Sequence, residues 1–196
     1  MSMNVTDALG GTMTESVASA VSWPAIFAGG MIAIAVSLVM LTLGSGLGFA
    51  AAAPWPHGGF GGGTFTAATG VWLIVTQWVS ASVGGYLTGR LRTKWTGVHT
   101  HEVFFRDTAH GFLAWALATV AVAALAAVAA SASATSAMHA AAAAAYDSGL
   151  SEQDAETAAR HGAAAFAIFT ALSMLVGGFV GCVAAALGGQ QRDNHP

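Results

Sequence analysis

The residues best suited to chemistry lie in one polar segment, Gly97 to Gly111, which concentrates three of the seven histidines. Imidazole and carboxylate groups are common ligands of zinc and other divalent ions. The candidate ligands for a metal or a haem are His99, His101 and His110. The segment holds no second ligand pair at a fixed distance and no recognised metal signature, so we predict no metal site and no cofactor, with the three histidines as the alternative.

Ordinary helix interactions explain the same segment. Glu102 and Arg106 are four residues apart and can pair on a helix surface. Asp107 lies near the expected start of an apolar helix, where a negative charge is favourable, and it shares a helix face with His110. We therefore expect Glu102, Arg106 and Asp107 to orient this segment or to contact a partner.

A second group of polar residues interrupts two apolar runs. The group comprises Gln77, Ser80, Thr170 and Ser173, together with Thr76. These side chains can line a narrow polar path for a small solute, but interhelical hydrogen bonds are the favoured interpretation. No Asp, Glu, Lys or Arg lies in the middle of an apolar run, which argues against a charge-coupled transporter.

The sequence carries none of the common enzyme signatures. It has no Gly-rich phosphate loop followed by Lys, no Gly-x-Ser-x-Gly nucleophile elbow and no intramembrane pair of aspartates. The single cysteine, Cys182, lies in an apolar run and has no partner for an internal disulfide. We predict that the protein is not an enzyme and that it has no catalytic residues.

The elements that must position these residues are long apolar helices. Of the 196 residues, 55% are hydrophobic and 8% are charged, against about 25% charged in a typical soluble domain. A bilayer core needs roughly 20 apolar residues per helix, and four runs are long enough, at about 24–49, 65–91, 111–132 and 163–187. Such long runs without alternation exclude a barrel. The predicted fold is an all-α polytopic bundle of four transmembrane helices, one membrane domain over residues 1–196.

The basic residues predict the orientation of this bundle. Four of the six, Arg90, Arg92, Lys94 and Arg106, lie at the end of the second span or in the connection to the third. Lys and Arg favour cytoplasmic loops, so we predict that the connection 92–110, the N-terminal segment 1–22 and the tail 188–196 are cytoplasmic. The expected location is a bacterial inner membrane.

The third and fourth helices are predicted to extend beyond the membrane as an external hairpin over residues 133–162. Alanine, the strongest helix former, dominates the sequence up to Tyr146. The following segment, Asp147 to Ser151, is typical of a turn. Within it Gly149 suits a helix end, and Ser151 suits an N-cap with Asp154 three residues later.

Two similar segments, Val83-Gly84-Gly85-Tyr86 and Val176-Gly177-Gly178-Phe179, are 93 residues apart. They indicate two tandem two-helix repeats related by an axis along the membrane normal. Glycines four residues apart allow helix backbones to approach closely. We expect helix packing, and association into a homo-oligomer, from Gly84, Gly85, Gly89, Gly177, Gly178 and Gly181.

Four segments carry a family resemblance, at Ser22–Gly30, Leu43–Gly48, Gly84–Leu91 and His110–Ala116. Through them about the first 120 residues resemble a group of uncharacterised proteobacterial inner-membrane proteins, some labelled "PhnA-like". The resemblance implies a small multispan membrane protein and implies no activity. The connection 92–110 is longer and richer in histidine and charge than this group leads one to expect.

Together these features predict a non-enzymatic membrane protein that self-associates or serves as an accessory subunit of a larger membrane assembly. The expected partners are membrane lipid, including bound lipid, and further membrane subunits, with no nucleic acid. One alternative is a small channel or facilitator lined by polar residues of the second and fourth spans. Another is a metal- or haem-binding membrane subunit.

Overall fold

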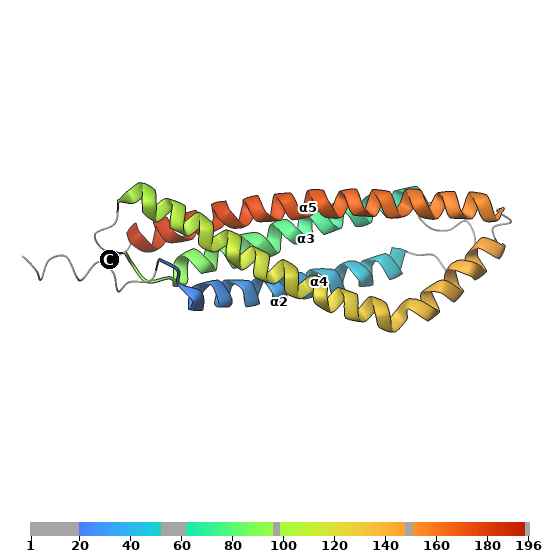
Figure 1. Ribbon diagram of the computed structural model, residues 1–196, viewed down its shortest axis with the longest axis horizontal. Helices are drawn as coiled ribbons and strands as arrows, with labels where there is room; N and C mark the ends of the chain where they lie inside the picture. The colour runs from blue at the N-terminus through green and yellow to red at the C-terminus, as the bar shows by residue number, and fades with distance from the viewer. Residues whose placement is uncertain (1–19, 52–61, 96–98, 148–150, 195–196) are drawn as a thin grey trace, which may run out of the picture.

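The computed structural model describes residues 20–51, 62–95, 99–147 and 151–194. These residues form four α-helices and contain no strand: α2 (Trp23–Ala51), α3 (Gly62–Leu91), α4 (Thr100–Asp147) and α5 (Glu152–Asn194). Figure 1 shows them side by side along the long axis, with α2 and α4 running in one direction and α3 and α5 in the other. The predicted all-helical bundle is confirmed.

Three of the helices are long and apolar enough to cross a membrane, over Trp23–Gly48, Thr100–Ala132 and Ala159–Asn194. Helix α3 has 30 residues and is therefore as long as α2, which has 29. Its described part is less apolar because Thr76, Gln77 and Ser80 lie in its middle. The chain thus has the length and composition of a membrane protein, and α3 packs against the other three helices.

The packing inside the bundle depends on small residues. Helices α3 and α4 each contact all three other helices, whereas α2 and α5 lie at opposite corners and make no contact in the described part of the chain. Apart from Ile26, the fully buried apolar side chains among the described residues are alanines. Large apolar side chains point outward instead, as at Leu175 and Phe179, which are 73% and 71% exposed. Such an inverted distribution suits helices surrounded by lipid, where small residues allow close packing.

The closest approach is between the parallel helices α3 and α5. A side chain at Gly85 would collide with the backbone carbonyl of Gly181, and one at Gly89 would collide with that of Ala185. The predicted packing glycines therefore lie at helix contacts: Gly84 meets Ala33 of α2, and Gly177 and Gly178 face the indole of Trp115. Close backbone contact keeps α3 and α5 in a fixed register.

One predicted boundary differs from the structure. The connection 92–110 is not a continuous loop, because α4 already begins at Thr100. The backbone carbonyl of His99 accepts from the amides of Glu102 and Val103 at 3.0 and 3.1 Å. Hydropathy marks only the apolar part of a helix, and the polar first turns of α4 fall outside that signal. The described connection between α3 and α4 is correspondingly short.

At the other end of α4 the helix continues through the alanine-rich sequence to Asp147, and α5 begins at Glu152. The predicted N-cap is confirmed: the amide of Asp154 donates to Oγ of Ser151 at 3.2 Å, and this hydroxyl donates to the carboxylate of Asp154 at 2.6 Å. The predicted turn residue Gly149 lies outside the described residues. Figure 1 shows α4 changing direction in its second half and returning to α5 at this tip.

Candidate functional site

A buried ion pair joins the end of α3 to helix α4. Arg92, the first residue after α3, donates from Nε to Oδ1 of Asp107 and from Nη2 to Oδ2, the second bond at 2.6 Å. Of the side chains, 0% of Arg92 and 2% of Asp107 is exposed. Two parallel hydrogen bonds fix the orientation of both groups. Because a buried charge is unfavourable unless it is paired, each partner depends on the other.

The end of α5 adds two further charged residues to this ion pair. Nη2 of Arg92 lies 3.3 Å from Oδ2 of Asp193, and Nη1 donates to the carbonyl of Thr93 at 3.1 Å. Arg192 donates from Nη1 to the backbone carbonyl of Arg92, and its Nε lies 3.1 Å from Oδ1 of Asp193. All three guanidinium nitrogens of Arg92 are therefore engaged. We call Arg92, Asp107, Arg192 and Asp193 the charged cluster.

A glycine of α5 leaves the space in which the ion pair lies. A Cβ atom at Gly189 would collide with Oδ2 of Asp107, lie 2.6 Å from its Cγ and lie 3.1 Å from Nη2 of Arg92. Real Cβ atoms essentially never lie within 3.0 Å of another atom, which excludes both contacts with Asp107. The carboxylate can therefore reach Arg92 only because position 189 has no side chain.

The indole of Trp95 covers the charged cluster. The guanidinium carbon of Arg92 lies 4.3 Å from the ring centroid of Trp95, and that of Arg106 lies 5.2 Å from it. The same indole contacts the ring of His110 at a centroid distance of 5.5 Å. A cation near an aromatic face is attracted to the ring, and the attraction increases where water is excluded. Trp95 thus holds the short connection against the start of α4.

His110 attaches the start of α2 to α4. Its Nε2 lies 2.7 Å from the backbone nitrogen of Ser22, and its Nδ1 lies 2.6 Å from the carbonyl oxygen of Arg106. A backbone N–H only donates and a carbonyl only accepts, so Nε2 must be the acceptor and Nδ1 must carry the hydrogen. This assignment describes a neutral imidazole with both nitrogens engaged. The residue itself is 2% exposed.

Together, the charged cluster and His110 connect all four helices at one end of the bundle. The groups that make these bonds satisfy one another rather than facing an open cavity. The chemistry available to this arrangement is conformational: it can hold the helix ends together or, if a bond is broken, release them. Removing one partner of such a buried pair leaves an uncompensated charge, which costs several kcal/mol.

The three histidines considered as metal ligands do not share one environment. His99 and His101 are exposed at the start of α4, whereas His110 is buried and bonded through both ring nitrogens. Within the described ranges, no three His, Cys, Asp or Glu side chains lie close enough together to hold a metal ion. The described geometry therefore offers no metal centre built on His110.

The predicted contact residues Glu102, Arg106 and Asp107 separate into two sets. The i,i+4 pair is confirmed, with Nε of Arg106 2.7 Å from Oε1 of Glu102 near the surface. Asp107 faces inward, and the expected stabilisation by a nearby helix start is wrong, because α4 begins at Thr100 and Asp107 lies two turns further on. Pairing with Arg92 takes its place.

Sequence reasoning missed five members of this site: Arg92 as an ion-pair partner, Trp95, Gly189, Arg192 and Asp193. In the sequence alone, the basic residues predict only the orientation of the bundle. The available signal was an arginine directly after an apolar helix and an aspartate one turn before an apolar run. Unpaired charges so close to the hydrocarbon of a membrane are unfavourable, which favours pairing of the two residues.

The polar residues in the middle of α3 and of α5 gather where α3, α4 and α5 meet. Ser80 donates to the carbonyl of Thr76 at 2.8 Å, and Ser173 donates to that of Thr170 at 3.0 Å. The amide oxygen of Gln77 and the indole nitrogen of Trp115 both approach Gly177, each 2.8 Å from the position of a Cβ there. Ser80 and Ser173 thus bond within their own helices rather than across them.

Three buried polar atoms in this region have no hydrogen-bond partner in the described part of the chain. They are Oγ1 of Thr76, Nε1 of Trp115 and Oγ1 of Thr170. Buried polar atoms are normally satisfied by protein or by water. The region therefore holds polar atoms that water or a bound group could satisfy.

Comparison with protein-family models, with curated proteins and with solved structures finds no match for this chain. The geometry of the molecule itself is what supports a function.

Proposed function

We propose that the protein is a non-enzymatic integral membrane protein that self-associates or serves as an accessory subunit of a larger membrane assembly. The observation that carries this proposal is an outward-facing small-residue surface on α2. Gly46 has no atom within 4 Å of the position of a Cβ, and Thr42, one turn earlier, is also exposed. Small residues four apart on a lipid-facing surface are typical of helix association in membranes.

A shallow groove accompanies these residues. It is lined by Leu38, Val39, Thr42, Leu43, Gly46 and Leu47 and has a volume of about 570 Å³. A helix of a second copy or of another subunit can place its side chains in this groove and its backbone against Gly46. The small residues between α3 and α5 already contact each other inside the bundle. Gly46 of α2 has no such neighbour, so its face is open to the same kind of contact with another helix.

We further propose that all four helices cross the membrane. Helix α3 is as long as α2 and contacts all three other helices, and its polar residues Thr76, Ser80 and Thr88 are buried in the bundle. In this arrangement the end with Arg90, Arg92, Lys94 and Arg106 faces the cytoplasm of a bacterial inner membrane, following the positive-inside rule.

The resemblance to uncharacterised proteobacterial inner-membrane proteins fits this proposal, and so does a tandem two-helix repeat. The repeat would relate α2 to α4 and α3 to α5, and each of these pairs runs parallel. In the α3–α5 contact, Gly85 meets Gly181, not Gly178 as the 93-residue offset would give, so the two copies are displaced by about one helical turn.

The mass of the purified protein in mild detergent tests self-association. Wild type is expected to run as an oligomer in light scattering coupled to gel filtration, and Gly46→Leu is expected to run as a monomer. Gly162→Leu is the matched control, because Gly162 is also exposed and has no atom near its Cβ position. A monomeric wild type that co-purifies with no other membrane protein would contradict the proposal.

A second candidate, a channel or facilitator for a small uncharged solute, is favoured by the three unpartnered polar atoms of Thr76, Trp115 and Thr170. A solute or a file of water passing between α3, α4 and α5 would satisfy them. Flux of small neutral solutes into liposomes tests this candidate. Flux that falls on Gln77→Leu supports it, and flux no greater than in protein-free liposomes contradicts it.

A further inference from the structure

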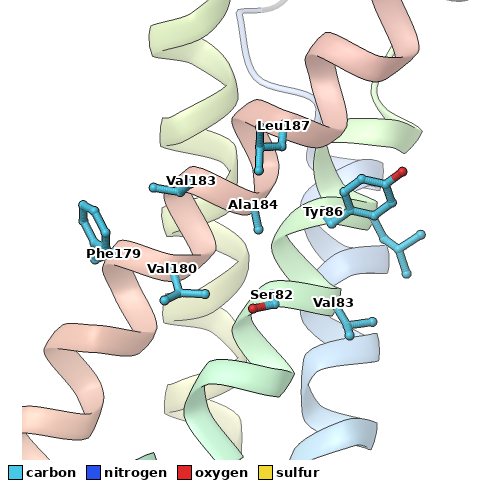
Figure 2. Close-up of a pocket in the computed structure, with 9 residues that line it drawn as sticks. Ser82, Val83, Tyr86, Phe179, Val180, Val183, Ala184 and Leu187 are labelled. Atoms are coloured by element: carbon cyan, nitrogen blue, oxygen red, sulfur yellow. The ribbon is translucent and has the colours of Figure 1, made fainter. Parts of the chain in front are cut away.

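An apolar groove runs between α3 and α5 on the outside of the bundle. Figure 2 shows the residues that line it, with Ser82, Val83 and Tyr86 on α3 and Phe179, Val180, Val183, Ala184 and Leu187 on α5. The groove has a volume of about 600 Å³, and Leu87 completes its lining. Phe179 and Leu187 are 71% and 51% exposed, so this surface is open to the surroundings of the bundle.

The groove is nearly as long as the hydrocarbon half of a bilayer is thick. From Phe179 to Leu187 it follows two turns of α5, about 12 Å at 1.5 Å per residue. Half of a bilayer core is about 15 Å thick. An acyl chain lying along the helices therefore fits the groove over most of one leaflet, with its tail towards Phe179 and its headgroup towards Leu187.

Polar groups lie at the headgroup end. The hydroxyl of Tyr86 donates to Oε1 of Gln191 at 2.7 Å and so connects the two helices at the end of the groove. Arg90 lies one turn beyond Tyr86 on the same face of α3. Tyrosine and arginine side chains at the end of an apolar helix are typical of the interface between hydrocarbon and headgroups.

Arg90 differs from the other four arginines. Arg92, Arg106, Arg160 and Arg192 each form an ion pair with a carboxylate. Among the described residues Arg90 has neither an ion pair nor a hydrogen bond from its side chain, although it is half-buried. A guanidinium that is partly removed from water and lacks a carboxylate has its charge and its donors available for a phosphate group.

We propose that the α3–α5 groove binds an anionic phospholipid, with one acyl chain between Val83 and Val183 and the phosphate against Arg90. A basic residue at the membrane surface attracts anionic lipid. A second copy of the chain is a poorer occupant, because symmetric packing through this groove would bring two Arg90 side chains together, and like charges across an interface are unfavourable.

Native mass spectrometry of the full-length protein in mild detergent tests this site. Phosphatidylglycerol and phosphatidylcholine with identical acyl chains are titrated in separate experiments. Wild type is expected to bind phosphatidylglycerol about fivefold more tightly, the factor expected for one basic residue at a membrane surface. Arg90→Gln is expected to bind both lipids equally. Arg160→Gln, which removes a charge from the opposite part of α5, is the matched control and should keep the preference.

A second variant tests the groove rather than the charge. Val183 is 42% exposed, and Val183→Trp fills the groove without disturbing the interior. It is expected to weaken binding of both lipids, whereas Val120→Trp, on the outer face of α4, is expected to leave both unchanged. A fivefold preference that survives in Arg90→Gln would overturn the proposal. So would a Val183→Trp variant that no longer forms oligomers but binds both lipids as tightly as wild type.

These outcomes are separate from the proposed self-association. Gly46→Leu alters α2, which makes no contact with α5 in the described part of the chain. A monomeric Gly46→Leu variant that still prefers phosphatidylglycerol supports the lipid site independently of oligomerisation. A Gly46→Leu variant that loses the preference places the lipid at the α2 surface and overturns the site in the α3–α5 groove.

Discussion

Replacing Asp107 by asparagine removes the charge that compensates Arg92 while keeping the size of the side chain. The guanidinium, 0% exposed, would then be paired with only one carboxylate, that of Asp193, whose side chain is 36% exposed and whose Oδ2 lies 3.3 Å away. Removal of one partner from a buried pair costs about 3 to 5 kcal/mol. Because Asp193 still compensates part of the charge, we expect the free energy of unfolding to fall by about 3 kcal/mol.

Reversible unfolding in mixed micelles, by titration with a denaturing detergent, measures this change. Circular dichroism follows the helices, and tryptophan fluorescence follows the six tryptophans, among them Trp95, whose ring centroid lies 4.3 Å from the guanidinium carbon of Arg92. Glu102→Gln provides the matched control, because it removes a carboxylate from the near-surface pair with Arg106. Exposed i,i+4 pairs contribute about 0.3 to 0.5 kcal/mol, so the two substitutions should differ several-fold.

A double variant separates the ion pair from general damage to the site. Arg92→Leu combined with Asp107→Leu removes both charges, and replacing a buried pair by apolar residues is often nearly neutral. The double variant should therefore be more stable than Asp107→Asn. The assigned role of the ion pair is refuted if Asp107→Asn costs no more than Glu102→Gln, or if the double variant loses as much as the two single variants together.

Further substitutions test the other contacts at the helix ends. Gly189→Ala should lower the free energy of unfolding by about 1 to 3 kcal/mol through overpacking against the ion pair. Gly162→Ala, with open space around it, should not lower it. Equal melting curves for the two variants would contradict this expectation. His110→Phe should cost roughly 1 to 3 kcal/mol by leaving the Ser22 amide without its acceptor, and hydrogen exchange at that amide should accelerate. Ser151→Ala should cost about 1 kcal/mol of local helix stability, seen as faster exchange at the start of α5; unchanged exchange would rule out the cap.

The helices and their local interactions were predictable because their signals are close together in sequence. Hydropathy located three of the membrane-length helices, and spacing predicted the Glu102–Arg106 pair and the cap at Ser151. The start of α4 at Thr100 was not predicted, because its first turns are polar and helical hydropathy becomes visible only from Gly111.

The charged cluster could not be derived from spacing. Arg92 and Asp107 are 15 residues apart, and Arg92 and Asp193 are 101 apart. Their meeting depends on the lengths of α3 and α4 and on the register set by Gly89 against Ala185. The role of Gly189 follows from the same register, since its importance comes from a carboxylate on another helix.

The proposed arrangement of four crossing helices is tested most directly by single-cysteine labelling in a Cys182→Ala background. Cysteines are introduced at three exposed positions: Ala20 before α2, His101 at the start of α4 and Gln153 at the start of α5. A membrane-impermeant maleimide applied to intact spheroplasts should label Gln153→Cys alone, and Ala20→Cys and His101→Cys should react only after permeabilisation. Labelling of Ala20→Cys and His101→Cys on opposite sides would show that α2 and α3 do not both cross, and would contradict the four-helix arrangement. Exposure of His101→Cys on intact spheroplasts would contradict the orientation.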